Sequence, residues 1–221
     1  MLASFVILHL SMEKIVVLGN LSHNDYDWLK NSNYLSSFVR HENRTDILFP
    51  RNIDADSQRE RIVCFVMSTP RNRLARSAIR RTWGKVIKPL FIMGLSDKTT
   101  MDIVEDEAKV FDDIIVEDFV DSYLNLTIKT AFAMKHFSKH FNTSKYFLKV
   151  DDDVFLNPKN LYSLLKSVGL TKNAIIGRKG LSLKPHRDLE NKWYMPYWLY
   201  REDTFPDYVD GPAYLIPGED A

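Results

Sequence analysis

The sequence predicts an α/β fold in which helices cover both faces of an open, mostly parallel sheet. From residue 61 onward, short apolar runs alternate with longer amphipathic stretches, which is the order of strands and helices in a parallel sheet. One apolar run ends abruptly in Asp151, Asp152 and Asp153. Ligands of such sheets bind at the carboxyl ends of the strands. The predicted fold therefore puts these carboxylates where a ligand is expected.

The period and the boundaries of the runs predict the individual elements. Strands are expected at residues 61–67, 90–93, 114–116, 146–150 and 174–176. Helices are expected at residues 74–83, 100–110, 123–141 and 158–168. Thr99 or Thr100 is expected to cap the second helix, and Pro158 opens the last one. The chain beyond residue 179 is aromatic and irregular, so no element is predicted there.

The composition is that of a globular protein with a core of ordinary size. The chain has 221 residues, of which 45% are hydrophobic and 27% charged. A net charge of +1 gives no general attraction to nucleic acid, and we expect no nucleic-acid partner. The single cysteine, Cys64, excludes an internal disulfide and is expected to be buried and unreactive.

The chain divides into three expected parts. Residues 1–18 are a candidate for part of a membrane anchor or signal segment, although they are equally compatible with a strand. Residues 19–60 are polar and without a sustained period, as expected of a stem or linker. Residues 61–221 form the expected folded domain, since the alternation of strands and helices begins at residue 61.

The three consecutive aspartates indicate a divalent metal site. Like charges at the end of a buried strand are costly unless a cation neutralises them. On an extended backbone Asp151 and Asp153 point to the same side and can share one ion, while Asp152 points elsewhere. Carboxylate oxygens favour Mg²⁺ or Mn²⁺. A solvated acidic loop is the alternative interpretation.

The predicted helix at residues 74–83 carries a stripe of arginines. At helical spacing Arg73, Arg76 and Arg80 share one face, and such a stripe after a strand is suited to phosphate or pyrophosphate. A solvated helix face is the alternative. The apolar side chains expected to pack on the sheet are Leu74, Ala75, Ala78, Ile79 and Trp83.

A third group of polar residues follows the strand expected at residues 114–116. Asp121 or Ser122 can cap the next helix. The remaining acidic residues and Lys129 are suited either to contacts with a sugar or to a buried network with the arginine stripe. The sequence leaves both interpretations open.

With these groups in view, the chain resembles the β-1,3-galactosyltransferases of glycosyltransferase family 31. The resemblance rests on Arg-x-x-Ile-Arg-x-Thr-Trp at residues 76–83, Glu-Asp-x-x-Asp-x-Tyr-x-Asn-Leu-Thr-x-Lys at residues 117–129, and Lys-x-Asp-Asp-Asp-x-Phe at residues 149–155. The order and spacing of these motifs also agree. The resemblance covers about residues 61–214.

The resemblance implies a GT-A fold, a UDP-sugar as donor substrate, Mn²⁺ as cofactor, and inverting transfer to a glycoprotein or glycolipid glycan through a β-1,3 linkage. It also implies a type II protein of the Golgi membrane with a luminal catalytic domain. By the motifs of the family, Asp151 and Asp153 are expected to hold the metal. The residues expected to bind the UDP-sugar are Arg76, Arg80, Asp118, Lys129 and Asp152.

The sequence departs from the pattern of the family near its end. Ala213 replaces a glycine and Pro217 replaces a serine, and the chain stops at Ala221, before the segment that supplies the general base. The fold is therefore expected to be incomplete at the C-terminus and the catalytic base to be absent. A non-catalytic protein that binds UDP and metal, or a folding partner of active relatives, is the alternative function. Phosphoryl transfer at the aspartates is a third.

Overall fold

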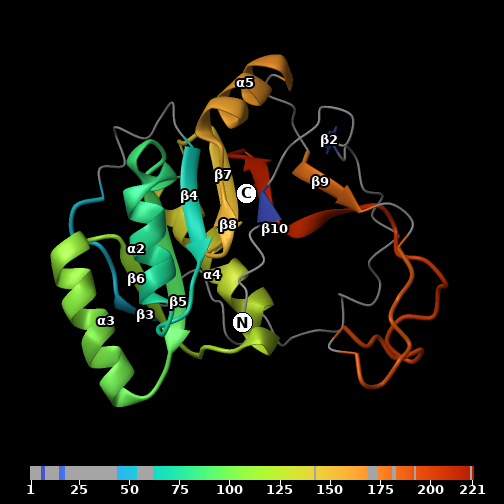
Figure 1. Cartoon of the computed structure of the whole chain (residues 1–221), viewed down its shortest axis with the longest axis horizontal. Helices are drawn as coiled ribbons and strands as arrows, with labels where there is room; N and C mark the ends of the chain where they lie inside the picture. The colour runs from blue at the N-terminus through green and yellow to red at the C-terminus, as the bar shows by residue number, and fades with distance from the viewer. Residues whose placement is uncertain are drawn as a thin grey trace.

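The structure is a computed structural model of the whole chain (Figure 1). It describes residues 6–7, 15–17, 44–53, 62–141, 143–168, 174–180, 183–191, 193–219 and 221.

A mixed sheet forms the centre of the molecule, as the sequence predicts. Its four central strands run parallel in the order β7, β4, β5, β6. These strands are β4 (Ile62–Met67), β5 (Pro89–Leu95), β6 (Ile114–Val120) and β7 (Tyr146–Asp151). All six residues of β4 are buried, which explains why its sequence is a continuous apolar run rather than an alternating one.

Antiparallel strands extend the sheet at both edges. On one side, β3 (Asp46–Leu48) pairs with β6. On the other, β10 (Tyr208–Pro217) pairs with β7, β9 (Ile176–Gly180) pairs with β10, and β2 (Ile15–Val17) pairs with β9. A separate parallel pair joins β1 (Val6–Ile7) to β8 (Val154–Phe155).

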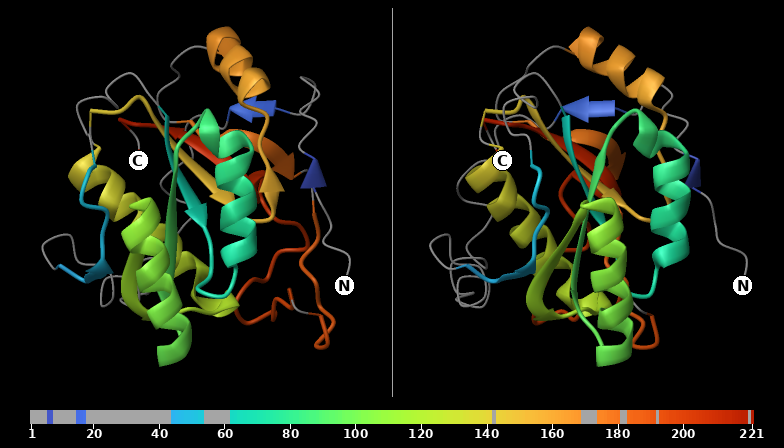
Figure 2. Two further views of the ribbon diagram at one scale, coloured as in Figure 1. Left: turned by 60° about the vertical axis from the view of Figure 1, so that its left-hand side comes forward. Right: turned by 90° about the vertical axis from the view of Figure 1, so that its left-hand side faces the viewer.

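Helices cover both faces of the sheet, which confirms the predicted architecture (Figure 2). The helices are α2 (Arg73–Arg81), α3 (Lys98–Phe111), α4 (Leu126–His140) and α5 (Pro158–Val168), with 3₁₀ turns η4 (Trp83–Lys85) and η5 (Tyr123–Asn125). Helices α2, α3 and α5 contribute to one hydrophobic cluster, and α4 contributes to the other. The strands supply both clusters because alternate residues point to opposite faces: Cys64 packs into the first and Phe65 into the second.

Several sequence predictions need correction. The strand expected at residues 174–176 is β9 (Ile176–Gly180), and the helix expected at residues 123–141 is the 3₁₀ turn η5 followed by α4. Helix α3 begins at Lys98, two residues earlier than expected, because the Asp97 carboxylate accepts the Thr100 backbone N–H at 3.0 Å and caps the helix. Strand β10 was not predicted, and it fills the position between β7 and β9. Finally, Leu74 is 86% exposed and Ala78 is also exposed, whereas Arg76 is fully buried.

Helix α2 is therefore turned differently from the prediction. Ile79 and Trp83 do pack in the core, as expected. The side chain that accompanies them is Arg76 rather than Leu74, because Arg76 finds polar partners inside the protein, as described below.

Most of the expected stem and membrane segment, within residues 1–60, lies outside the described part of the chain. Residues 44–53 of the expected stem are described and include β3. Within the described residues, no helix is both long and apolar enough to cross a membrane.

Candidate functional site

The three aspartates lie at the carboxyl end of β7, as the sequence predicts. Asp151 is the last residue of β7, and Asp152 and Asp153 form the turn into β8. In the parallel pair β4–β7, Asp151 lies opposite Met67, so the aspartates adjoin the end of β4. Two adjacent strands thus present their carboxyl ends to the same place.

Asp152 is tied to the chain that follows β4. Its Oδ2 accepts hydrogen bonds from Ser68 Oγ at 2.7 Å and from Asn72 Nδ2 at 3.0 Å. Asp152 is partly exposed, and its hydrogen bond with the fully buried Ser68 holds the carboxylate in position. Asp152 therefore has a different environment from its two neighbours, as the alternation of side chains along a strand predicts.

Asp151 is paired with a lysine of its own strand. Lys149 Nζ donates to Asp151 Oδ1 and also to the backbone carbonyl of Gly211 on β10, the latter at 2.5 Å. Burial raises the pKa of the Asp151 carboxyl; Lys149 opposes this effect, and Asp153 and Asp152 add to it. A cation near Asp151 would therefore relieve an unfavourable concentration of charge.

The chemistry of the residues present fits a hard divalent ion. Among the described residues, Asp153 has no hydrogen-bond or ion-pair partner, and only one Asp151 oxygen is bonded to Lys149. No group of three or more His, Cys, Asp or Glu side chains in the described part of the chain is arranged to hold a metal. Two carboxylates suffice for Mg²⁺ or Mn²⁺, because these ions keep several waters or phosphate oxygens as ligands.

All the hydrogen-bond donors of the Arg76 guanidinium bind groups within the protein. Its five N–H groups donate to Glu107 Oε1 (3.0 Å) and Oε2 (2.6 Å), to Ser68 Oγ (3.1 Å), and to the carbonyls of Thr69 (2.6 Å) and Pro70 (3.2 Å). A guanidinium has five such donors, so none is left for a ligand. Arg76 instead holds residues 68–70, the segment that also holds Asp152.

Arg80 joins the same network through Glu107. Its Nη1 donates to Glu107 Oε1 at 2.6 Å, and its Nε and Nη2 form a two-pronged pair with Asp113 at 2.7 and 2.8 Å. Burial alone would raise the pKa of Glu107, but hydrogen bonds from Arg76 and then Arg80 outweigh it and hold that pKa below its ordinary value. Arg76 and Arg80 of the arginine stripe are thus neutralised by acidic residues of α3 and of the turn after it, whereas Arg73 is exposed.

Lys129 connects the ends of two strands. Its Nζ donates to the Ser68 carbonyl at 2.6 Å and to Asp121 Oδ1 at 3.0 Å, and the side chain is almost completely buried. Asp121 also accepts the Gly94 backbone N–H at 2.8 Å. Asp121 therefore binds Lys129 and the end of β5 instead of capping α4. Of the two interpretations of Lys129, the buried network is observed, although its partner is Asp121 and not the arginine stripe.

The two acidic residues at 117 and 118 lie away from the aspartate turn. They belong to β6, which is separated from β7 by β4 and β5. Glu117 is buried and contacts His136 Nε2 of α4. Asp118 is exposed, and its backbone N–H donates to the Thr45 carbonyl at 3.2 Å.

A cavity of about 320 Å³ lies at the carboxyl ends of β4, β5 and β6. Its lining comes from residues 69–71 after β4, Ser96 after β5, residues 121–123 after β6, and Leu126 and Lys129 of α4. Ser68 and Asn72 lie on either side of residues 69–71, and both donate hydrogen bonds to Asp152. Asp152, Arg76 and Lys129 therefore all bind the segment of residues 68–72, which forms one wall of the cavity.

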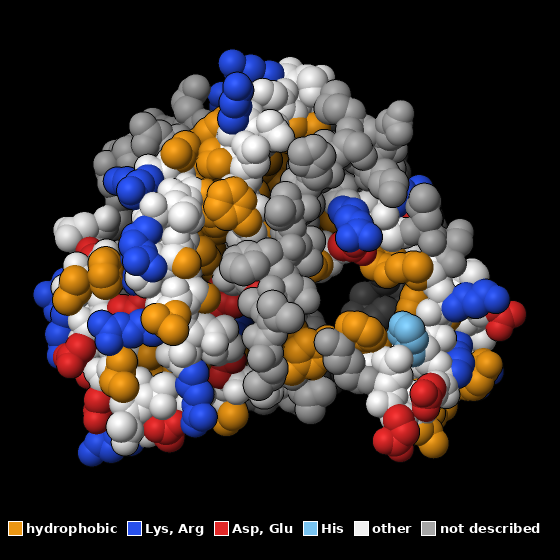
Figure 3. All heavy atoms as spheres, viewed as in Figure 1, with side chains coloured by type: hydrophobic (Ala, Val, Ile, Leu, Met, Phe, Trp, Pro, Cys, Tyr) orange, Lys and Arg blue, Asp and Glu red, His pale blue; other side chains and the backbone are white. Residues whose placement is uncertain are grey.

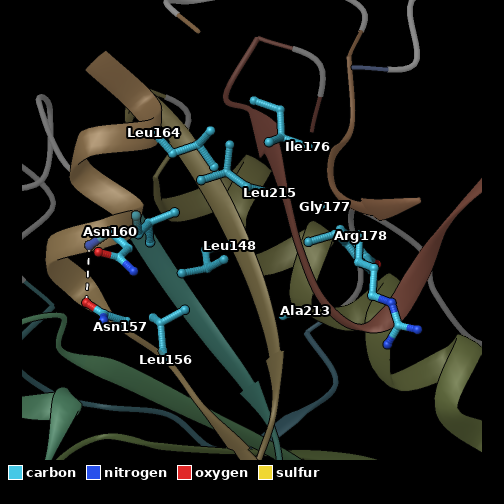
Figure 4. Close-up of a pocket in the computed structure, with 12 residues that line it drawn as sticks. Leu148, Leu156, Asn157, Asn160, Leu164, Ile176, Gly177, Arg178, Ala213 and Leu215 are labelled. Carbon is cyan, nitrogen blue, oxygen red and sulfur yellow. Dashed lines mark hydrogen bonds between the residues drawn. The ribbon is translucent and has the colours of Figure 1, made fainter. Parts of the chain in front are cut away.

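A second cavity is apolar and lies beneath α5 (Figure 4). It has a volume of about 50 Å³. Leu148, Leu164 and Leu215 approach each other across it, while the Arg178 side chain extends away from them. Its few polar groups do not converge, and Asn157 Oδ1 already accepts the Asn160 backbone N–H at 3.1 Å. This cavity is a small packing void in the hydrophobic core rather than a polar ligand site.

Ala213, which replaces a glycine of the family pattern, fits its position. It pairs with Val150 in the regular antiparallel ladder between β10 and β7. Among the described non-glycine residues only Asp112 has a positive φ, so Ala213 is not strained. The neighbouring residues Asp210–Ala213 form a bulge opposite β9.

Ser68 is the residue of the site that the sequence analysis missed. It binds Asp152 and Arg76 through its hydroxyl and Lys129 through its carbonyl, and so joins all three motifs. Its position in the sequence could have indicated this role, because Ser68 is the first polar residue after the apolar run that forms β4.

The mostly parallel sheet with helices on both faces, together with carboxylates at the carboxyl end of β7, is consistent with a glycosyltransferase fold of the GT-A type. A model of the family described as "Galactosyltransferase" matches residues 74–221. The chain therefore belongs to the galactosyltransferase family.

Individual relatives agree with this assignment. Beta-1,3-galactosyltransferase 1 of Mus musculus and of Homo sapiens are each 38% identical to the chain over 167 residues, covering 72% of this chain and 51% of the relative. Lactosylceramide 1,3-N-acetyl-beta-D-glucosaminyltransferase of Xenopus tropicalis is 35% identical over 172 residues, covering 70% of this chain and 45% of the relative. The chain spans about half the length of these curated relatives.

Proposed function

We propose that the chain binds a UDP-sugar at the carboxyl edge of its sheet and transfers the hexose, galactose or an N-acetylhexosamine, to a glycan with inversion, forming a β-1,3 linkage. The observation that carries the proposal is the cavity of about 320 Å³ at the ends of β4, β5 and β6, joined to Asp152 through Ser68 and Asn72. It is large enough for much of a nucleotide, and the residues on either side of its 69–71 wall bind Asp152, which lies between the two carboxylates suited to a divalent ion.

In this proposal Asp151 and Asp153 hold Mn²⁺, which when bound supplies Lewis-acid stabilisation of the leaving diphosphate. Asp152 offers a fixed acceptor to a hydroxyl of the UDP-sugar, because Ser68 and Asn72 hold its carboxylate in place. Lys149 orients Asp151 and holds β10 beside it.

Arg76 and Lys129 contribute indirectly, by fixing residues 68–70 at one wall of the cavity. Arg80 supports Arg76 through their shared partner Glu107. Direct binding of the UDP-sugar by Asp118 remains a prediction from the resemblance alone.

Membership of the family supports a proposal for the acceptor and for the compartment. We propose a glycan of a glycoprotein or glycolipid as acceptor, and the lumen of the Golgi as the place of reaction. The relative from Xenopus tropicalis is named for lactosylceramide. This name supports a galactose-containing glycan as one candidate for the acceptor.

A transfer assay tests the proposal. The purified full chain is incubated with Mn²⁺, lactose and, in separate reactions, labelled UDP-galactose, UDP-N-acetylglucosamine and UDP-N-acetylgalactosamine, and the linkage in the product is assigned by NMR. We expect transfer from one of these sugars, its loss in Asp153→Asn, and full activity in Asp102→Asn, an exposed aspartate of α3. Binding of UDP without transfer from any of the three sugars would instead support the non-catalytic alternative.

A further inference from the structure

An exposed aromatic surface lies on the irregular chain between β9 and β10. Trp193, Tyr197 and Trp198 expose 54%, 60% and 80% of their surface. Large aromatic side chains are usually buried, and several exposed ones close together in the sequence indicate a binding surface. We call Trp193, Tyr197 and Trp198 the aromatic surface.

The aromatic surface begins at the rim of the proposed UDP-sugar cavity. The indole N–H of Trp193 donates to the hydroxyl of Tyr123 at 3.0 Å, and Tyr123 lines the cavity. At its other end the segment leads into β10, where the Gly211 carbonyl accepts from Lys149 beside Asp151. The chain that carries the aromatic side chains therefore connects the cavity with the aspartate turn. In Figure 3 a hollow with hydrophobic side chains along part of its rim opens on this face of the molecule.

Polar groups fix the backbone of this segment. Arg187 lies over the Tyr197 ring, 3.9 Å from its centroid, and donates to the carbonyls of Met195 at 2.6 Å and Glu202 at 2.9 Å. The His186 and Trp193 rings are 5.7 Å apart. Trp198, by contrast, makes no hydrogen bond or ring contact with another described residue. A supported segment with one unused indole face is a preorganised binding surface.

We infer that the aromatic surface is the acceptor site and that it binds a saccharide whose ring packs on Trp198. A pyranose has an apolar face of C–H groups that matches an aromatic ring, and hydroxyls that match polar groups at the edge of the rings. Transfer also requires the acceptor hydroxyl to reach the sugar of the UDP-sugar, and Trp193 of the aromatic surface donates a hydrogen bond to Tyr123, which lines that cavity. The inference rests on the proposed function and adds to it the binding site of the second substrate.

Saturation-transfer NMR on the full chain, with lactose as the probe, tests the inference. We expect saturation of the lactose ring protons, and an affinity roughly tenfold lower in Trp198→Ala, given the typical strength of an aromatic contact. Leu189→Ala is the matched control, because Leu189 belongs to the same irregular chain and is 75% exposed but carries no ring. It should bind lactose like the unchanged protein. Because Trp198 is so exposed, its removal should leave folding and the binding of UDP with Mn²⁺ unaffected.

The outcomes separate this inference from the proposed function. If the chain binds UDP but does not bind lactose, the acceptor site is overturned and the UDP-sugar site stands. The same conclusion follows if the chain binds UDP and Trp198→Ala still binds lactose. Lactose binding that depends on Trp198 without any binding of UDP would support a saccharide surface and refute the UDP-sugar site. Trp198-dependent binding of the chain to phosphatidylcholine vesicles, in the absence of lactose binding, would assign the surface to a membrane and overturn the inference.

Discussion

Replacement of Glu107 by glutamine should destabilise the fold strongly, although the residue lies outside the proposed binding site. Glu107 accepts three short hydrogen bonds from two buried or half-buried guanidinium groups. The neutral amide that Glu107→Gln introduces keeps only one carbonyl oxygen as acceptor, and its N–H groups face other N–H donors. Hydrogen bonds to charged groups contribute about 1.5–3 kcal/mol each, and loss of one partner of a buried ion pair costs about 3–5 kcal/mol. We therefore expect the free energy of unfolding to fall by about 3–5 kcal/mol.

Urea denaturation followed by circular dichroism measures this loss as a lower midpoint. Asp106→Asn is the control, because Asp106 lies on the same helix and makes only an exposed pair with Lys109. A change in Glu107→Gln as small as that of the control would refute the assignment of Glu107 as the centre of the network.

The same network predicts how stability depends on pH. Because the pKa of Glu107 in the folded protein lies below its ordinary value of 4.5, its contribution is complete above that pH and is lost as the pH falls through the lowered pKa. Below pH 4.5 the unchanged protein should therefore lose stability more steeply than Glu107→Gln, which does not titrate at this position. Equal slopes for the two proteins in this acidic range would contradict the pairing.

Three further predictions concern single positions. Lys129→Met breaks the buried ion pair at the carboxyl edge, so the free energy of unfolding measured in urea should fall by roughly 3 kcal/mol, and an unchanged value would contradict the pairing. Gly94→Ala places a Cβ 2.5 Å from the Phe119 carbonyl oxygen, so the free energy of unfolding should fall by about 1–3 kcal/mol and the melting temperature should fall with it. In the control Gly211→Ala the new Cβ meets no atom within 4 Å, so the melting temperature should not fall comparably. Burial raises the pKa of the Cys64 thiol, so an aromatic disulfide reagent should label it only after denaturant is added, and rapid labelling of the native protein would show that the strand is accessible.

The sequence predicts the parallel centre of the fold well because buried strands carry their own signal. The short length of the apolar run before Asp151 favours a buried strand, and the abrupt change to carboxylates marks its carboxyl end. The motif at residues 149–155 then predicts where the proposed metal site lies. These predictions succeed because they depend only on residues that are close together in the sequence.

The errors concern features that depend on distant residues. Arg76 turns inward because Glu107, 31 residues away, accepts two of its hydrogen bonds, and no local pattern shows this partner. Strand β10 was missed because Gly211 and Pro212 interrupt its pattern, and it becomes a strand by pairing with β7 and β9. Ser68 was missed because its role exists only where three motifs meet in space.

The most direct test of the account is a calorimetric titration of UDP into the full chain, with and without Mn²⁺, repeated with Asp153→Ala and with the control Asp102→Ala. The account predicts binding that requires Mn²⁺, is lost in Asp153→Ala and is unchanged in Asp102→Ala, since Asp153 has no other partner among the described residues. No binding of UDP to a chain shown by circular dichroism to be folded would contradict it, as would binding that is indifferent to both Mn²⁺ and Asp153.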